Sequence, residues 1–200
     1  ERACLDVKKL AEAMTEKCMV AGIDLSGGKT AIQKNFYKNN KAFAVEQKNF
    51  YPCLGELINY LNGDYYGGLD VGFDYTMLQK LTDYTDFTTK YSNPDIGSLC
   101  TAAGVYNALK AAVKFKLKKD SVKDLKIAVK GVGKVGYQLI NYLLEDGAKL
   151  IIADKNLDKI KFPDKLQIGS SHEIKKIDHD EIHKEEVDIY SPCALGNDIR

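Results

Sequence analysis

Several features that mark specialised protein classes are missing from this sequence. Its 200 residues contain no tryptophan, four prolines and three histidines. Lysine and arginine (29) nearly balance aspartate and glutamate (28), so the chain lacks the basic excess of nucleic-acid-binding proteins. No apolar run approaches the roughly 20 residues that span a bilayer. With 44% hydrophobic and 28% charged residues, the composition predicts a globular protein without nucleic-acid or membrane partners.

The cysteines are few and scattered. They number five, which is odd, form no C-x-x-C pair and lie far in sequence from the histidines. This pattern disfavours a disulfide framework and a structural zinc site. We therefore expect no metal and a reducing, cytoplasmic location. The cysteines are Cys4, Cys18, Cys53, Cys100 and Cys193.

Hydrophobic periodicity predicts a mostly helical first half. Apolar residues recur at helical spacing over residues 3–21 and 43–61, and Pro52 is expected to start or interrupt a turn. The other expectations for this half are a β-like run at the end of 22–33, a strand at 65–71, a helix at 74–82 and a loop at 83–97.

Helical and strand patterns alternate in the second half. After a helix at 101–116, an apolar strand is predicted at 126–130, a helix at 137–145 and a second strand at 150–154. This order is one βαβ unit, which predicts an α/β fold with a parallel sheet. A further strand is expected at 187–190, and the mixed charges of 175–186 predict a solvated face.

A glycine-rich turn joins the first strand of this βαβ unit to its helix. In Gly131-Val132-Gly133-Lys134-Val135-Gly136 the first glycine permits a tight turn, the second lets backbone approach a pyrophosphate and the third allows close helix packing. The phosphates would bind the free N–H groups of the helix N-terminus. Asp154 closes the next strand, where a carboxylate accepts hydrogen bonds from a ribose diol and repels a 2′-phosphate. The turn therefore predicts binding of NAD over NADP, a preference softened by Lys134 and Lys155.

Lys29 lies in a second glycine-rich turn. The spacing of Gly22 and Gly28 does not match the P-loop motif G-x-x-x-x-G-K, so a P-loop is rejected. A lysine beside glycines is accessible to a substrate, and burial or a second ammonium nearby favours the neutral form that acts as a base. Taken alone, however, Lys17, Lys29 and Asp70 are compatible with ordinary surface residues.

The segment that contains both lysines resembles the active-site segment of a known family. Residues 14–30 (MTEKCMVAGIDLSGGKT) are similar to those of the glutamate, leucine, phenylalanine and valine dehydrogenase superfamily, most of all its leucine-type branch. Further similar segments follow in order over nearly the whole chain: Leu61-Asn-Gly63, Leu69-Asp-Val-Gly72, Thr82-Asp-Tyr-Thr85, Thr101-Ala-Ala-Gly-Val-Tyr106, the turn Gly131 to Gly136, Ala153-Asp154 and Ser191-Pro-Cys-Ala-Leu-Gly196.

The resemblance implies a reaction and a role for individual residues. The reaction is the NAD-dependent, reversible oxidative deamination of an L-amino acid to its 2-keto acid and ammonia. Lys29 falls on the catalytic lysine, Asp70 on the catalytic aspartate and Lys17 on the lysine that binds the substrate carboxylate. The residues that fall near the nicotinamide are Thr101, Cys193 and Ala194.

The resemblance also implies the domain order. Residues 1–97 correspond to an incomplete substrate-binding and catalytic α/β domain, and residues 98–200 to an incomplete Rossmann-like NAD-binding domain. Because the sequence starts at Glu1 without a methionine and ends at Arg200, we interpret it as a fragment of a longer protein. The full-length protein is expected to form a homo-oligomer.

Some positions depart from the family pattern. Ser26 stands where a third glycine is usual, and Asn93 to Cys100 replace a tighter turn. Arg200 stands where the family has an asparagine, which leaves Asn197 as the nearer amide. These departures make the contact on the nicotinamide side an open question.

Gly68, two residues before Asp70, bears on the choice of substrate. Compared with alanine, glycine removes a methyl group and enlarges the substrate pocket, which favours bulkier side chains by about 1–3 kcal/mol. The similarity as a whole favours a branched-chain, leucine-like substrate, with phenylalanine second and glutamate third. A different class of function also stays open, namely a non-catalytic NAD-binding remnant of the family.

Overall fold

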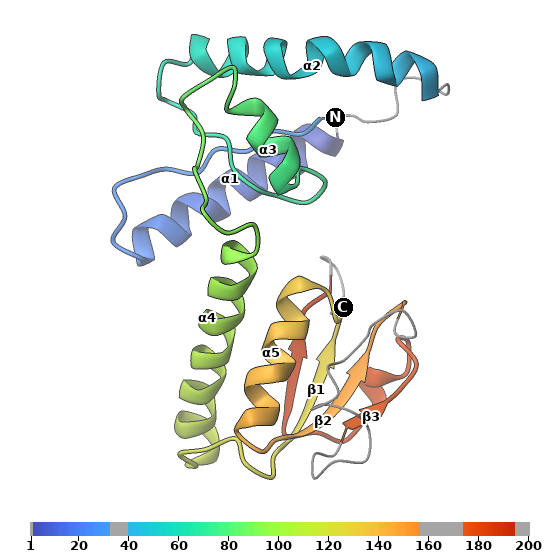
Figure 1. Ribbon diagram of the computed structural model, residues 1–200. Helices are drawn as coiled ribbons and strands as arrows, with labels where there is room; N and C mark the ends of the chain where they lie inside the picture. Colours follow the sequence, from blue (N-terminus) through green and yellow to red (C-terminus); the bar gives the residue numbers. More distant parts are fainter. Residues whose placement is uncertain (1, 33–39, 157–173, 195–200) are drawn as a thin grey trace. The chain divides into compact units, whose positions relative to one another are not determined.

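The chain divides into two compact units. The computed structural model describes residues 2–32, 40–156 and 174–194. Unit 1 comprises Glu1–Ser92 and unit 2 comprises Asn93–Arg200 (Figure 1). The boundary predicted after residue 97 falls slightly later, inside the first turn of helix α4 (Ile96–Ala112).

Unit 1 is built mainly of helices. Helices α1 (Arg2–Val20), α2 (Asn40–Tyr60) and α3 (Tyr75–Leu81) confirm the three predicted from periodicity. Pro52 lies inside α2 and neither starts nor ends it, so the expected interruption is wrong. A core cluster around Tyr51, Ile58 and Leu81 joins α2 to α3.

The strand predicted at residues 65–71 is absent. Instead, Gly67 forms an isolated bridge with Thr88, in which its N–H donates to Phe87 and its carbonyl accepts from Thr89. Adjacent glycines at 67 and 68 supply no side chains to pack, which weakens a strand. The β-like run expected at the end of 22–33 is also absent as far as Ile32, the last residue described there.

Unit 2 contains a four-stranded parallel sheet in the order β3–β2–β1–β4. Strands β1 (Lys126–Lys130) and β2 (Lys149–Ala153) flank helix α5 (Lys134–Glu145), which confirms the predicted βαβ unit. Strand β4 (Ile189–Pro192) confirms the strand predicted at 187–190. Strand β3 (Ile174–Lys176) was not predicted, because its short sequence has one apolar residue.

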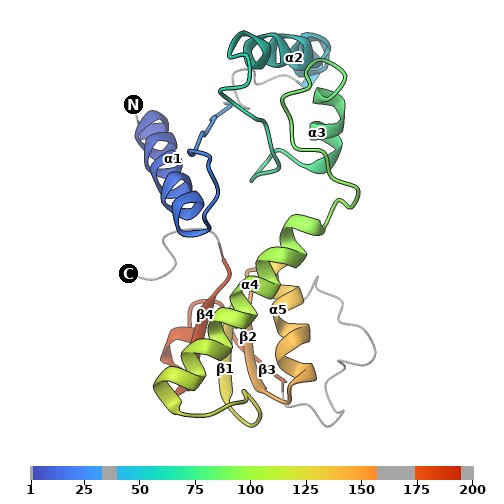
Figure 2. The ribbon, with the colours of Figure 1, turned by 90° about the vertical axis from the view of Figure 1, so that its left-hand side faces the viewer.

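Each strand of the central pair contributes side chains to both faces of the sheet. On one face, Ile127 and Val129 of β1 pack with α5 and α4, which lie side by side (Figures 1 and 2). On the opposite face, Ala128 packs with Ile182. Ile182 begins the short helix η4 (Ile182–Lys184) and is fully buried, so the segment predicted as a solvated face also supplies core.

Helix α4 leads into the sheet through a π-helical turn. The turn η1 (Val113–Leu117) continues α4 and ends at Lys118, whose φ is +56°. The helix predicted at 101–116 therefore begins earlier, at Ile96, and its start shortens the loop expected at 83–97. In the part of the chain that is described, no helix is both long and apolar enough to cross a membrane.

Candidate active site

Lys29 and Asp70 form a direct ion pair in unit 1. The lysine side chain is 24% exposed and the aspartate side chain 44% exposed, so the pair is partly shielded from water yet remains accessible. Of the residues that the sequence singles out in unit 1, the structure joins these two. A base and an acid in contact are able to exchange a proton directly.

A tight turn presents Asp70. Asp70 and Phe73 exchange backbone hydrogen bonds of 3.1 and 2.9 Å, and Gly72 between them has a φ of +78°. That conformation suits the third position of a type II turn and favours glycine there. The Asp70 carboxylate also accepts a hydrogen bond of 2.6 Å from the Val71 N–H. The turn thus fixes one carboxylate oxygen while the other contacts Lys29.

The glycines before Lys29 contact other parts of unit 1. A methyl group at Gly27 would clash with backbone and side-chain atoms of α1, and the Gly27 N–H donates a 2.9 Å hydrogen bond to Thr15 Oγ1. A methyl group at Gly28 would lie 2.8 Å from the ring of Tyr65. The sequence suggested that these glycines expose Lys29 to substrate; in the structure both allow close packing inside the unit.

Lys17 and Gly68 take no part in this ion pair. Lys17 is exposed in the last turn of α1 and, among the residues described, forms no ion pair. A methyl group at Gly68 would lie 3.3 Å from Thr89 Oγ1. Among the described residues, Thr89 is the one neighbour within 4 Å of such a methyl group, so it bounds the space beside Gly68 on one side.

The glycine turn of unit 2 adopts the geometry predicted from its sequence. Gly131 has a φ of +93°, and a methyl group there would lie 2.5 Å from the Ala194 nitrogen. A methyl group at Gly136 would clash with the Gly131 carbonyl, so this glycine lets α5 approach the turn. Gly133 caps the N-terminus of α5, and within the described residues nothing lies within 4 Å of a methyl group built there. The turn is open at the position that a pyrophosphate would approach.

Asp154 is tied to this turn. One carboxylate oxygen accepts a 2.7 Å hydrogen bond from the Val132 N–H, and the other accepts 2.8 Å from the Asn156 N–H. The Gly131 N–H donates to the Ala153 carbonyl at 2.7 Å. These bonds hold the end of β2 against the turn that follows β1.

The side chains that flank the turn differ in their surroundings. Lys134 opens α5 and forms an exposed ion pair of 3.1 Å with Asp95, the residue before α4. Val135 is half-buried in the same turn of α5. Thr101 is exposed on α4, and its hydroxyl donates to the Gly97 carbonyl at 2.7 Å. Asp95 is a neighbour of the turn that sequence reasoning missed.

Cys193, which follows β4, lies next to Gly131 of the glycine turn. Its N–H donates to the Lys130 carbonyl at 2.7 Å, and Ala194 next to it limits the space beside Gly131. Burial raises the pKa of the Cys193 thiol, and the hydroxyl of Ser191, 3.7 Å from the sulfur, partly offsets this. Asn197 and Arg200 lie outside the described residues.

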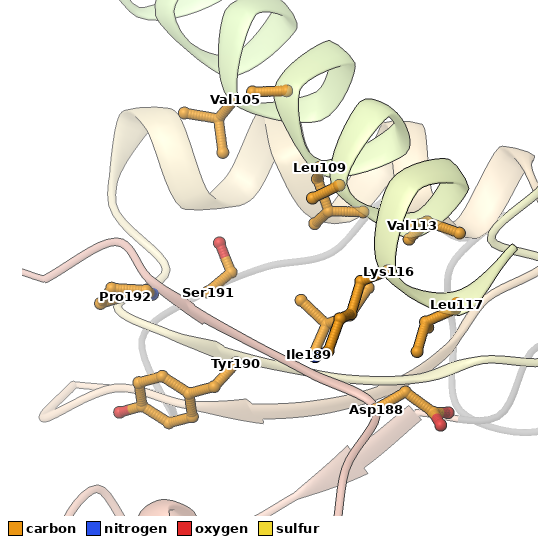
Figure 3. A pocket seen from close by; sticks show the side chains of 12 residues that line it. Val105, Leu109, Val113, Lys116, Leu117, Asp188, Ile189, Tyr190, Ser191 and Pro192 are labelled. Carbon is orange, nitrogen blue, oxygen red and sulfur yellow. The ribbon is translucent and has the colours of Figure 1, made fainter.

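A separate groove of about 460 Å³ runs between α4 and β4 (Figure 3). Its walls are mostly apolar and include Val105, Leu109 and Ile189, with Lys116 and Asp188 also on its lining. None of the predicted site residues lines it. Within the described part of the chain, no cluster of three or more His, Cys, Asp or Glu side chains could hold a metal ion.

Relatives of known function match the whole chain. It is 36% identical to leucine dehydrogenase from Bacillus subtilis and 34% identical to phenylalanine dehydrogenase from Lysinibacillus sphaericus. Each alignment covers 100% of this chain, and 53% and 52% of the respective relative. The chain thus spans about half the length of the curated relatives it matches. No protein-family model matches it.

A solved structure similar to this chain is also an amino-acid dehydrogenase. The chain resembles L-tryptophan dehydrogenase from Nostoc punctiforme with a TM-score of 0.68 and 26% identity, over 97% of this chain and 52% of that one. The parallel sheet and glycine turn of unit 2 define a Rossmann-like domain. The relatives narrow the comparison further: over its whole length the chain is similar to amino-acid dehydrogenases, among them leucine and phenylalanine dehydrogenases.

Proposed function

We propose that this chain carries the catalytic lysine and the cofactor turn of an NAD-dependent L-amino-acid dehydrogenase. The reaction is the reversible oxidative deamination of a branched-chain, leucine-like amino acid to its 2-keto acid and ammonia. The observation that carries the proposal is the Lys29–Asp70 ion pair, because it unites a base and an acid on two segments far apart in sequence. The relatives named leucine dehydrogenase support the choice of substrate.

The residues of unit 1 divide the proton transfers between them. The Lys17 ammonium binds the substrate carboxylate. Transfer of the ion-pair proton from Lys29 to Asp70 gives a neutral amine and a neutral carboxyl group, and the amine then takes a proton from water while the water oxygen attacks the carbon of the protonated imine. Asp70 gives its proton to the amino group, the C–N bond breaks as ammonia leaves, and the aspartate takes the proton of the carbinol hydroxyl as the keto group forms. Lys29 gives the proton it took from water to the departing ammonia, so both residues return to their starting protonation states. The hydride from Cα is accepted by the nicotinamide when the cofactor is bound.

Unit 2 has residues that fit a dinucleotide. Gly133 leaves open space at the N-terminus of α5, where backbone N–H groups bind phosphate. The Asp154 carboxylate lies beside the turn and favours a ribose diol over a 2′-phosphate, which supports NAD. Thr101, Cys193 and Ala194 are the residues we assign to the nicotinamide side.

Phenylalanine is the second candidate substrate. Gly68 favours it, because it leaves room that a larger residue would fill, and phenylalanine dehydrogenases are also among the relatives. Leucine remains the first choice, because the chain is 36% identical to relatives named leucine dehydrogenase and 34% identical to a phenylalanine dehydrogenase.

The test is to measure NADH formation by the native protein that contains this chain. The panel is NAD⁺ or NADP⁺ with leucine, valine, isoleucine, phenylalanine or glutamate. We expect turnover with NAD⁺ and leucine, and a loss of about 10²- to 10⁴-fold in Lys29→Ala with NADH binding retained. Greater activity with phenylalanine would favour the second substrate. Silence across the panel with NADH binding intact would identify a non-catalytic cofactor-binding protein instead.

A further inference from the structure

We infer that Tyr65 is a positioning residue that holds the Lys29 loop, residues 27–30, in reach of Asp70. The inference rests on the proposed function, since it concerns the arrangement of the same lysine. Tyr65 touches neither a substrate nor a reacting atom in this account. It acts through the two residues that flank Lys29.

Tyr65 contacts the chain on both sides of Lys29. Before the lysine, its ring packs on Gly28 so closely that a methyl group there would lie 2.8 and 2.9 Å from ring carbons Cδ2 and Cε2. After the lysine, the Thr30 hydroxyl donates a hydrogen bond of 2.9 Å to the Tyr65 hydroxyl oxygen. One aromatic side chain therefore restrains the backbone at both neighbours of Lys29.

Helix α1 restrains the same loop through Thr15. The Thr15 hydroxyl donates to the Ala11 carbonyl at 3.1 Å and accepts from the Gly27 N–H at 2.9 Å. Gly27 itself packs on α1 without room for a side chain. With these contacts at Gly27, Gly28 and Thr30, the loop is fixed around Lys29, and the lysine side chain reaches Asp70.

The segment that holds the loop also carries the partner of the lysine. Tyr65 packs against the core cluster of unit 1, and Gly67 bonds to Phe87 and Thr89. Asp70 follows on the same stretch of chain. Residues 65–70 therefore contact the loop through Tyr65 at their start and the Lys29 side chain through Asp70 at their end. This arrangement couples the position of the Lys29 backbone to the position of its acid.

The test separates the hydrogen bond from the ring packing. Tyr65→Phe keeps the ring on Gly28 and loses the hydroxyl, and Thr30→Val removes the donor. A lost neutral hydrogen bond corresponds to about 2- to 12-fold, so we expect each variant to lower kcat by that factor. The KM for NAD⁺ should not change, and the fall in thermal unfolding temperature should be small because the bond is exposed. The double variant should be no slower than either single variant, because both remove one bond.

Removal of the ring has the larger expected effect. Tyr65→Ala removes the contacts of the tyrosine with Gly28 and Thr30 and leaves the Thr15 contact with Gly27. The loop is then able to move, and a displacement of about 1 Å at a catalytic group costs on the order of 100-fold in rate. Tyr66→Phe is the matched control, because Tyr66 is the exposed neighbour and packs edge-on against Phe87. We expect Tyr66→Phe to retain the activity of the unmodified protein.

A second measurement decides the inference without turnover. Hydrogen–deuterium exchange of the peptide covering residues 21–32 should be faster in Tyr65→Ala than in the unmodified protein, and unchanged in Tyr66→Phe. Unaltered exchange in Tyr65→Ala, or additive losses in the double variant, would overturn the positioning role. If the unmodified protein produces no NADH with any amino acid, the proposed function fails, and the exchange result still decides the role of Tyr65.

Discussion

In unit 2 the candidate cofactor residues lie between buried regular elements, whereas in unit 1 the candidate catalytic residues lie on loops. The glycine turn follows β1 and begins α5, whose residues Leu139, Ile140 and Leu143 are fully buried. Around Lys29, by contrast, the supporting helix α1 buries Cys18 alone among its described residues. Glycine therefore allows close packing in two different environments, a buried core and a site near the surface. Gly131 and Gly136 pack inside a core, while Gly27 and Gly28 pack near the surface.

This difference predicts different consequences for a similar substitution. In unit 2 an added methyl group meets backbone that buried strands hold in place, so the fold itself should lose stability. In unit 1 the loop is able to move away from α1 or Tyr65, so the lysine should be displaced while the unit stays folded. Stability and activity measured together distinguish the two settings.

The largest effect is expected at Gly131. Gly131→Ala places a methyl group 2.5 Å from the Ala194 nitrogen at a φ of +93°, where backbone strain alone costs about 1–3 kcal/mol. The thermal unfolding temperature of unit 2 should fall by roughly 5–20 °C, and NADH binding should be lost. Gly133→Ala is the control, because its methyl group meets none of the described residues. It should weaken NADH binding and leave the unfolding temperature unchanged. Equal destabilisation by both variants would contradict the distinction.

The corresponding substitution in unit 1 is Gly27→Ala. A methyl group at this position clashes with α1, so the Lys29 loop must shift. A shift of about 1 Å lowers the rate on the order of 100-fold. We expect this loss in kcat for amino-acid deamination, with a change in unfolding temperature smaller than that of Gly131→Ala. If Gly27→Ala unfolds the protein and Gly131→Ala does not, the comparison between the units is reversed.

The geometry of the glycine turn at residues 131–136 was predictable because its motif is local. The glycines from 131 to 136 are contiguous, and the strand and helix around them have their own periodicity, so sequence alone predicted the βαβ unit. Lys29 and Asp70 were singled out by family resemblance, because no local pattern marks a contact between segments so far apart. The same reason explains why Tyr65 and Asp95 were missed. The strand predicted at 65–71 failed because adjacent glycines match a loop as readily as a bulged strand.

A hydrogen bond and an ion pair join α4 to the end of α5 and make the stability of unit 2 depend on pH. The Tyr106 hydroxyl donates to the Asp146 carboxylate, and Lys110 lies 3.4 Å from the same oxygen. The Tyr106 hydrogen bond, aided by Lys110 and opposed by burial, lowers the pKa of Asp146 below its usual 3.8. Because the folded pKa is depressed, this stabilisation is complete above about pH 4 and is lost as the pH falls below it. Asp146→Asn should cost about 0.5–1.5 kcal/mol of unfolding free energy at neutral pH.

The measurement is urea unfolding from neutral to acid pH. The difference between the unmodified protein and Asp146→Asn should narrow as the pH falls below the usual value of 3.8. Asp86→Asn is the control in unit 1, because the Asp86–Lys90 pair is exposed and surface pairs contribute little. A pH-independent difference for Asp146→Asn would show that packing, not the charge, joins the two helices.

The smallest expected effect is at the Asp95–Lys134 ion pair. Lys134 belongs to α5 of unit 2, but its side chain is exposed and is therefore able to change its partner. Both partners are exposed, at 56% and 72%, so the pair itself contributes about 0–1 kcal/mol. Lys134 opens the helix whose N-terminus we assign to the cofactor phosphates, and Asp95 competes with them for its ammonium. Asp95→Asn should therefore tighten NADH binding by up to about fivefold at low salt, and the gain should disappear as salt screens the phosphates. Asp120→Asn, which removes the exposed pair with Lys114, should leave NADH affinity unchanged. Weaker binding by Asp95→Asn would mean instead that Asp95 holds Lys134 in its phosphate-binding position, so that the ion pair is part of the fixed framework of the turn.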